Sequence, residues 1–305
     1  MAERDPDPET PPCHVCETPS GFFLVKDHYR LYRCPNCRLV FVSPQPGADY
    51  LATAVYSEAA GYHAREAREG WTLTPVQRRV LRELGAGRGR SLLDVGCSTG
   101  EFMHCARDHG FVVSGMELNS VTSGVARARG LSVCSGRLEE AGFDAAVFDV
   151  VVLGDVLEHV LNPKRLVTLC RHVLAPGGML VVSTPNLACS WARGTYLLSR
   201  WLSIPWSAVT PPHHLFQFSV CNLDQLVHGC GFTRERMWFH RPPPLLYEIG
   251  STHVLDRVKA RTTLSNVAKA TLVILLYATL YYGVDPMVSR LNGRDFSMVG
   301  MYRGG

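Results

Sequence analysis

One short segment constrains this chain more than any other, because it combines an apolar run, a turn of small residues and a later carboxylate. The run Ser91–Val95 is apolar enough for a parallel strand that is covered on both faces. Gly96, Ser98 and Gly100 then keep the turn free of bulky side chains, so a ligand can approach its backbone. Glu117 ends the next expected strand, about 20 residues later, where a carboxylate can accept hydrogen bonds from both ribose hydroxyls. The segment therefore predicts a nucleoside site.

Two other classes of protein share a strand, a glycine-containing turn and a helix. A dinucleotide site requires a third glycine where this turn has Glu101, whose carboxylate would repel a pyrophosphate. The same turn also fits G-x-S-x-G, the nucleophile elbow of α/β-hydrolases. An elbow needs neither Asp94 before its first glycine nor an acid at the end of the next strand. Both alternatives are therefore disfavoured.

Four motifs follow one another between Leu92 and Asn186: LLDVGCSTG, GMELN, FDVVVLGDVLEHV and LAPGGMLVVSTPN. In this order they resemble the class I S-adenosylmethionine-dependent methyltransferases. The resemblance implies an enzyme with an α/β, Rossmann-like fold and a mostly parallel seven-stranded sheet. Ser98 stands where that family usually has glycine. By this resemblance the cofactor-binding residues are Asp94, Gly96, Cys97, Ser98, Gly100, Glu117, Leu118, Arg137, Leu138, Gly154, Asp155 and Val156.

Strands and helices are expected to alternate along this domain, which predicts a parallel sheet with the ligand at the carboxyl ends of its strands. A helical region at 49–84 precedes the first strand, and a helix is expected at 221–230. The expected strands lie at 91–95, 111–117, 131–134, 148–153 and 179–183, followed by an antiparallel pair at 232–240 and 296–302.

Four of the eleven cysteines predict a structural zinc site. Cys13-x-x-Cys16 and Cys34-x-x-Cys37 are separated by 17 residues, a spacing typical of four-cysteine zinc modules. Each pair directs two sulfurs at one metal, and two pairs complete a closed tetrahedron. The intervening residues have the β-rich character of a zinc-ribbon hairpin. Unpaired surface cysteines or a redox pair are the alternatives, and the other seven cysteines are expected to be core thiols.

The domain organisation follows from these motifs and from an apolar content of 46%, which supports one large core and a small module. Residues 1–12 are expected to form a disordered tail, 13–47 the zinc ribbon and linker, and 48–305 the methyltransferase domain with acceptor-side insertions at 187–220 and 242–293. The tail has no apolar signal core, so we expect a reducing, cytoplasmic location.

Methyl transfer requires an aligned acceptor and, for a weakly nucleophilic acceptor, a group that removes its proton. His214 lies in PPHHLFQFS, which resembles the acceptor-side loop of sugar C-methyltransferases with an N-terminal zinc module. There a histidine after a glutamate is the base, whereas here His213 replaces the glutamate. His159, after Glu158 at the expected start of a helix, is the second candidate. A structural role is the alternative for both histidines.

An apolar insertion suggests a membrane or a second subunit as a partner. Ala270–Val284 is uncharged for 15 residues, fewer than the about 20 that span a bilayer. Basic residues precede this segment, which suits an interfacial helix that would make the protein peripheral to a membrane. Packing in the protein's own core, or a homodimer through 264–284, is the alternative.

The leading function is O- or C-methylation of a small-molecule acceptor, such as a sugar, a quinol-type ring or a lipid-linked compound. A ribosomal or transfer RNA methyltransferase is one alternative, and a non-catalytic cofactor-binding scaffold is another. We expect no nucleic-acid partner, because the net charge of +4 is modest. Gly154-Asp155-Val156-Leu157 also stands where base-nitrogen methyltransferases commonly have Asp/Asn-Pro-Pro-aromatic.

Overall fold

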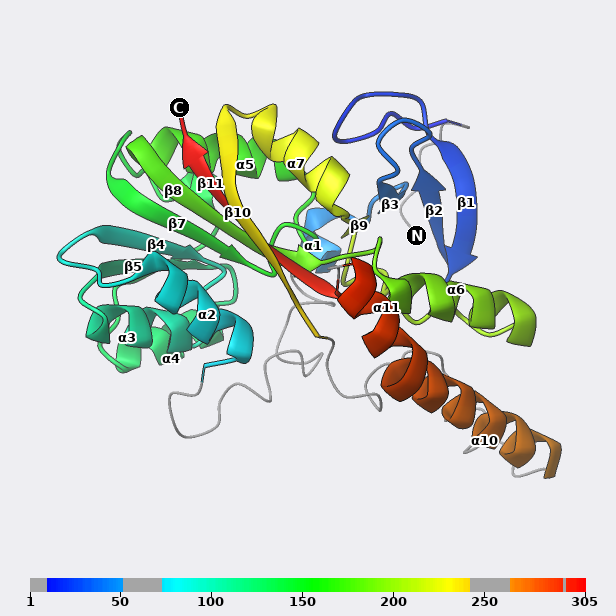
Figure 1. The fold of residues 1–305 in the computed structure, drawn as a ribbon. Helices are drawn as coiled ribbons and strands as arrows, with labels where there is room; N and C mark the ends of the chain where they lie inside the picture. The colour runs from blue at the N-terminus through cyan, green and yellow to red at the C-terminus, as the bar shows by residue number, and fades with distance from the viewer. Residues whose placement is uncertain (1–9, 52–72, 242–263, 293–294) are drawn as a thin grey trace.

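The computed structural model describes residues 10–51, 73–241, 264–292 and 295–305. Its centre is a sheet of seven strands in the order β10-β11-β8-β7-β4-β5-β6 (Figure 1). The strands are β4 (Ser91–Val95), β5 (Val112–Glu117), β6 (Val133–Ser135), β7 (Phe148–Gly154), β8 (Leu174–Pro185), β10 (Phe232–His240) and β11 (Ser297–Gly304).

Five of these strands are parallel, and β11 pairs antiparallel with both β8 and β10. Leu92 and Leu93 are both fully buried although they point to opposite faces, which is why this run is apolar without alternation. Helices α2 (Pro75–Leu84) and α3 (Glu101–Asp108) cover one face, and α5 (Pro163–Val173) and α7 (Val220–His228) cover the other. Helix α4 (Ser120–Ala128) packs on β5 and β6. The sequence prediction of an α/β fold with a mostly parallel sheet is confirmed.

A second sheet of four strands has the order β1-β2-β3-β9. Strands β1 (Gly21–Lys26) and β2 (Tyr29–Arg33) form the predicted hairpin, and Asp27 and His28 at its turn have φ of 50° and 69°, as a type I′ turn requires. Strand β3 (Val40–Val42) pairs with β9 (Phe216–Gln217). Because β9 belongs to the expected insertion at 187–220, that insertion and the N-terminal module share one sheet.

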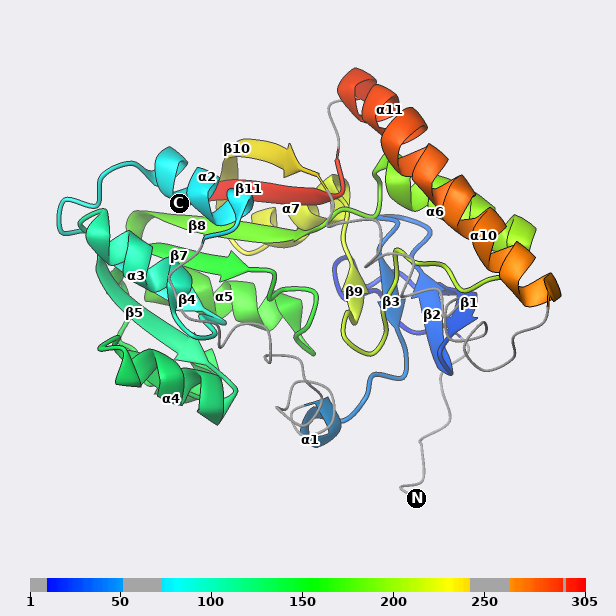
Figure 2. The same cartoon turned by 90° about the horizontal axis from the view of Figure 1, so that it is seen from below.

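Two helical segments lead away from the central sheet (Figures 1 and 2), and they diverge towards their far ends in Figure 1. One is α6 (Ser190–Leu202); the other consists of α10 (Leu264–Thr279), the π-turn η4 (Leu280–Val284) and α11 (Asp285–Asn292). The 15 uncharged residues at 270–284 are part of a longer helix that also includes the charged residues Lys269 and Asp285. Val267–Ser289 is one helical stretch of 23 residues, and an 18-residue part of it has a mean hydropathy of 1.6, which suffices to cross a membrane by length and composition alone. Counting only uncharged residues missed this, because the helix continues through Asp285, which accepts a hydrogen bond from Ser190.

The predicted helical region at 49–84 is represented by α1 (Ala48–Tyr50) and α2, while 52–72 lies outside the described residues. The predicted helix at 221–230 is confirmed as α7. Of the insertion expected at 242–293, residues 242–263 and 293 also lie outside the described part of the chain. The expected tail is described only from Thr10.

Candidate active site

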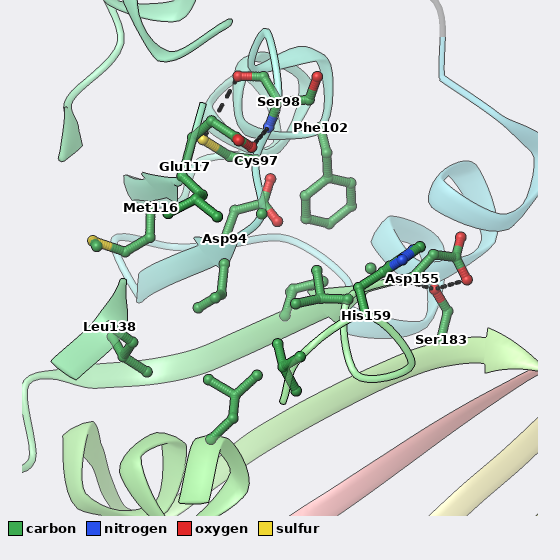
Figure 3. A pocket seen from close by; sticks show the side chains of 18 of the residues that line it. Asp94, Cys97, Ser98, Phe102, Met116, Glu117, Leu138, Asp155, His159 and Ser183 are labelled. Atoms are coloured by element: carbon green, nitrogen blue, oxygen red, sulfur yellow. Dashed lines mark hydrogen bonds between the residues drawn. The ribbon is translucent and has the colours of Figure 1, made fainter. Parts of the chain in front are cut away.

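A cavity of about 1350 Å³ opens at the carboxyl ends of β4, β5 and β7. Sites for one drug-sized ligand commonly measure about 300–1,000 Å³, so this cavity has room for two molecules. Figure 3 shows Glu117 and Ser98 on one side, and Asp155 and His159 on another. The cavity therefore joins the predicted cofactor turn to one of the predicted catalytic histidines.

The turn after β4 needs small residues for two reasons. Gly96 has a φ of +77°, and a Cβ atom there would lie 2.5 Å from Val156 Cγ2. Ser98 also has a positive φ, and its amide donates to Glu117 Oε2 at 2.9 Å. The Asn119 amide donates to the other oxygen at 2.8 Å. Glu117 is therefore fixed at the cavity wall, as a carboxylate that binds ribose hydroxyls must be.

Carboxylates concentrate on this side of the cavity. Asp94 is buried, and desolvation together with the charges of Glu117 and Glu101 raises its pKa to about 7. Glu101 begins α3 and pairs with Arg129 at 3.1 Å. A site with this excess of negative charge favours a ligand that carries positive charge. The sulfonium and ammonium groups of S-adenosylmethionine meet that requirement, so the residues present fit this cofactor.

Eleven of the twelve residues expected to bind cofactor line the cavity, including Leu118, Arg137, Leu138 and Gly154. Gly100 does not. It is the N-cap of α3, and a Cβ atom there would lie 2.2 Å from the Leu131 side chain, so its small size serves packing. For the eleven residues that line the cavity, the individual contacts with the cofactor stay predictions.

Asp155 lies at the end of β7 in a strained backbone conformation, with a φ of 53°. Its amide donates to the Ser183 hydroxyl at 3.1 Å, and that hydroxyl donates back to Asp155 Oδ1 at 3.2 Å. Partial loss of water raises the pKa of Asp155. Ser183 of β8 therefore sets the orientation of an acidic residue that faces the cavity (Figure 3).

A second group of titratable side chains lies beside Asp155. Ligand atoms of Glu158, His159 and His214 are all within 4.8 Å of one another. The rings of His159 and His214 meet edge to face at 4.8 Å. His159 Nδ1 donates to the His213 carbonyl at 2.6 Å, which leaves Nε2 as the basic nitrogen of the neutral ring. The cluster contains no residue of the cysteine module at 13–42, and none of the segment 91–155 that holds the cofactor turn.

Burial keeps the whole cluster close to neutral. It lowers the pKa of His159 to about 4 and that of His214 well below its usual value. Burial, together with the Asp155 charge, raises the pKa of Glu158 well above its usual value. Glu158 is 1% exposed, and no described residue hydrogen-bonds to either carboxylate oxygen. An ionised Glu158 could therefore balance one proton on a histidine, and the same three donors could also hold a divalent cation.

The structure separates the two candidate histidines. His159 lines the cavity. His214 packs against the His159 ring and does not itself line the cavity. The expectation that Glu158 and His159 begin a helix is wrong. Helix α5 begins at Pro163, with Asn162 as the N-cap that accepts from the Arg165 amide at 2.9 Å. The two residues therefore lie in the turn before α5, where their side chains are directed by β7 and by the histidine loop.

The four predicted metal ligands come together. The Cys13 and Cys37 sulfurs are 3.4 Å apart, as are those of Cys16 and Cys34, and all four lie within 4.8 Å of one another. The close approach couples the thiols: Cys37 lowers the pKa of Cys13, and Cys13 raises that of Cys37. Four cysteine sulfurs at these distances fit a closed, structural zinc site.

The cysteine module holds the loop that carries His213 and His214. Besides the β3–β9 pairing, the buried Lys26 ammonium donates to the carbonyls of Trp206 at 2.7 Å and Val209 at 2.5 Å. Asn222 donates to the Cys37 carbonyl at 3.3 Å. These contacts join residues about 180 positions apart, so no local sequence pattern could have identified Lys26.

Sequence reasoning also missed several residues that line the cavity: Phe102, Met116, Ser183, His240 and Arg241. Phe102 and Met116 belong to the quoted motifs or directly follow them, so the motifs' own apolar positions could have indicated them. His240 and Arg241 lie at the end of β10, and only the antiparallel pairing with β11 brings that end to the cavity.

Comparison with known proteins agrees with this geometry. A family model described as a methyltransferase domain matches residues 64–235. An enzyme of Coxiella burnetii, ubiquinone biosynthesis O-methyltransferase, is 28% identical over 120 residues, which are 37% of this chain and 51% of that protein. The same enzyme of Idiomarina loihiensis is 36% identical over 116 residues, or 35% of this chain and 47% of that protein. The chain thus spans about half the length of these relatives.

Among solved structures, Haemonchus contortus phospholethanolamine N-methyltransferase 2 has the same fold. That structure is a complex with phosphomonomethylethanolamine and S-adenosylhomocysteine. It has a TM-score of 0.51 and 17% identity, covering 84% of this chain and 59% of that one.

Proposed function

We infer, from the premise that this chain belongs to the methyltransferase-domain family and is an S-adenosylmethionine-dependent methyltransferase, that its acceptor is a hydroxylated small molecule. One observation carries the inference: Glu117, on the cofactor side, and His159, from the buried titratable cluster, face one cavity. The cavity volume of about 1350 Å³ leaves space for an acceptor beside the cofactor. A ring hydroxyl, as in a quinol, is the favoured acceptor group, because the matched relatives are named as ubiquinone O-methyltransferases.

The residues divide the work in the following way. S-adenosylmethionine supplies an activated methyl group when bound. Glu117, positioned by the Ser98 amide, holds the nucleoside, and the carboxylates of Asp94 and Glu101 favour its positive charge. His159 Nε2 would take the proton that the acceptor hydroxyl loses when it is methylated. An ionised Glu158 would then balance the charge of the protonated ring.

We further propose that Cys13, Cys16, Cys34 and Cys37 bind one structural zinc ion. The support is the approach of all four sulfurs to within 4.8 Å and the absence of an open position in a four-thiolate set. Through β9 and Lys26, the zinc module would then fix the loop that contains His214. The metal would act on acceptor geometry and take no part in the chemistry.

The experiment is a methyl-transfer assay with labelled S-adenosylmethionine and a panel of catechols, quinols, sugars and short RNA. We expect transfer to a hydroxyl of a small molecule, confirmed by mass spectrometry of the product. The control is the His159→Gln protein, which should bind cofactor normally and transfer slowly. Transfer to RNA alone, or cofactor binding without transfer to any of these acceptors, would overturn the proposal.

A further inference from the structure

Helix α6 and the long helix packed on it have one buried side and one exposed side. Trp191 of α6 meets the rings of Tyr277 and Tyr281 edge to face, at 5.7 and 5.5 Å. A Cβ atom on Gly194 would lie 2.7 Å from Leu280, so the two helices approach closely there. Helix α6 contacts η4 and α11, and the far end of α10 lies beyond the central sheet (Figure 2). Helix α6 and the long helix thus contact each other on one side only, and no described residue covers their opposite sides.

These uncovered sides are unusually apolar. We call them the helix-pair surface, defined by Leu197, Trp201, Val267, Leu272, Ile274, Leu275, Tyr282, Val284 and Met287. Trp201 and Tyr282 are each 71% exposed, and Leu197 is 68% exposed. A group of large exposed apolar side chains on neighbouring elements indicates a contact with another molecule or with lipid.

The charges on these helices have a single sign over most of their length. Arg193, Leu197, Arg200 and Trp201 are the exposed positions of α6, so its cations and its apolar side chains share one face. Lys269 is exposed on α10. The sequence has no Asp or Glu from 159 to 223, and none from 257 to 284. The helix-pair surface is therefore cationic as well as apolar.

This charge pattern decides between the two occupants that could cover the surface. A twofold dimer places a patch on its own copy, which would bring Arg193, Arg200 and Lys269 close to the same cations of the partner. A membrane leaflet with anionic lipids instead attracts those cations and accepts the apolar side chains between them. Exposed Trp and Tyr side chains also suit the boundary between headgroups and acyl chains.

We propose that the helix-pair surface docks this protein on an anionic lipid membrane. The long helix lies along the membrane surface, because its other side is already packed on Trp191 and Gly194. Helix α11 leads towards β11, whose first residue, Ser297, lines the cavity. The inference does not depend on the acceptor proposed above.

The test is flotation of the full chain with vesicles of phosphatidylglycerol and, separately, of phosphatidylcholine. We expect flotation with phosphatidylglycerol and little with phosphatidylcholine. Leu275→Ser should weaken binding about tenfold or more, because a buried leucine contributes about 1.5–3 kcal/mol. Arg193→Gln should weaken it about fivefold, because each cation near an anionic surface contributes about 1 kcal/mol. Val147→Ser and Arg107→Gln, positions away from these helices, are the matched controls and should float normally.

Cofactor binding, measured by calorimetry on every variant, separates a docking defect from a folding defect. Any of three outcomes would overturn the proposal. One is a protein that stays with neither vesicle. Another is a dimer in solution that Leu275→Ser and Arg193→Gln dissociate, which would assign the surface to a second copy of the chain. Equal flotation of Leu275→Ser and Val147→Ser would also contradict it.

Discussion

Most of the cofactor side of the cavity comes from one stretch of chain, Asp94 to Leu138, whereas the histidine side is assembled from segments far apart. On the cofactor side, Ser98 bonds Glu117 nineteen positions away. On the histidine side, Lys26 bonds carbonyls 180 and 183 positions away, and β3 pairs with β9. We therefore expect the cofactor side to keep its geometry when the N-terminal module is disrupted, and the histidine side to lose it.

The largest expected effect tests that division directly. Cys34→Ser should release zinc, and a structural zinc contributes about 10–16 kcal/mol, comparable to the whole stability of a domain. We expect loss of methyl transfer with S-adenosylmethionine affinity retained, measured by elemental analysis, activity and calorimetry. Cys221→Ser, an exposed cysteine of α7, is the control. A zinc-free Cys34→Ser protein with normal methyl transfer would show that the two sides do not differ in this way.

The next effect concerns the histidine that faces the cavity. His159→Gln should lower kcat by about 10²–10⁴-fold, the usual range for a general base, and leave cofactor affinity unchanged. His214→Gln should lower kcat less, because His214 does not line the cavity. If His214→Gln has the larger effect in stopped-flow or steady-state assays, His214 is the group that takes the proton.

The pH profile of kcat should carry the same information. Burial lowers the pKa of His159 to about 4, so the ring is neutral and able to accept a proton above that value. Activity should therefore be present at neutral pH and decline only as the pH falls towards about 4. A decline of kcat centred near the ordinary histidine pKa of about 6.5 would point to a different base. The decline towards low pH should be lost in His159→Gln.

A smaller effect is expected on the cofactor side. Glu117→Ala removes a carboxylate that can bond two ribose hydroxyls, and charged hydrogen bonds are worth about 1.5–3 kcal/mol each. Cofactor affinity should fall at least about tenfold by calorimetry. Glu117→Gln, which keeps the size of the side chain, should lose less. Zinc content should be normal in both variants, and a loss of zinc would mean that the two sides are coupled.

The smallest effect separates buried from surface attachment of the module. Lys26→Met leaves the Trp206 and Val209 carbonyls without their buried donor, so the free energy of unfolding should fall by about 1–3 kcal/mol. Glu17→Gln removes an exposed ion pair with Lys164 at 3.1 Å, and should change the free energy of unfolding by less than about 1 kcal/mol. Denaturant titrations compare the two. Equal effects would mean that the buried lysine does not hold the loop.

The sequence separation between contacting residues explains which predictions succeeded. The sheet order around β4, the turn at Gly96 and the position of Glu117 each depend on residues within one strand-turn-helix-strand unit. The cysteine cluster could also be predicted, because two short spacings define it. The helix boundary at Pro163 was missed because the resemblance was extended past the motif, although Asn162 and Pro163 are local signals for it.

By itself, the sequence determined the α/β fold, the cofactor turn and the four cysteines, because each is encoded by neighbouring residues whose geometry the backbone fixes. Only the tertiary structure placed His159 at the cavity and His214 behind it, joined β9 to the cysteine module and extended the apolar helix to Ser289. Those arrangements depend on burial and on pairing between distant segments. Such contacts are chosen by the packing of the whole chain, so no short pattern records them.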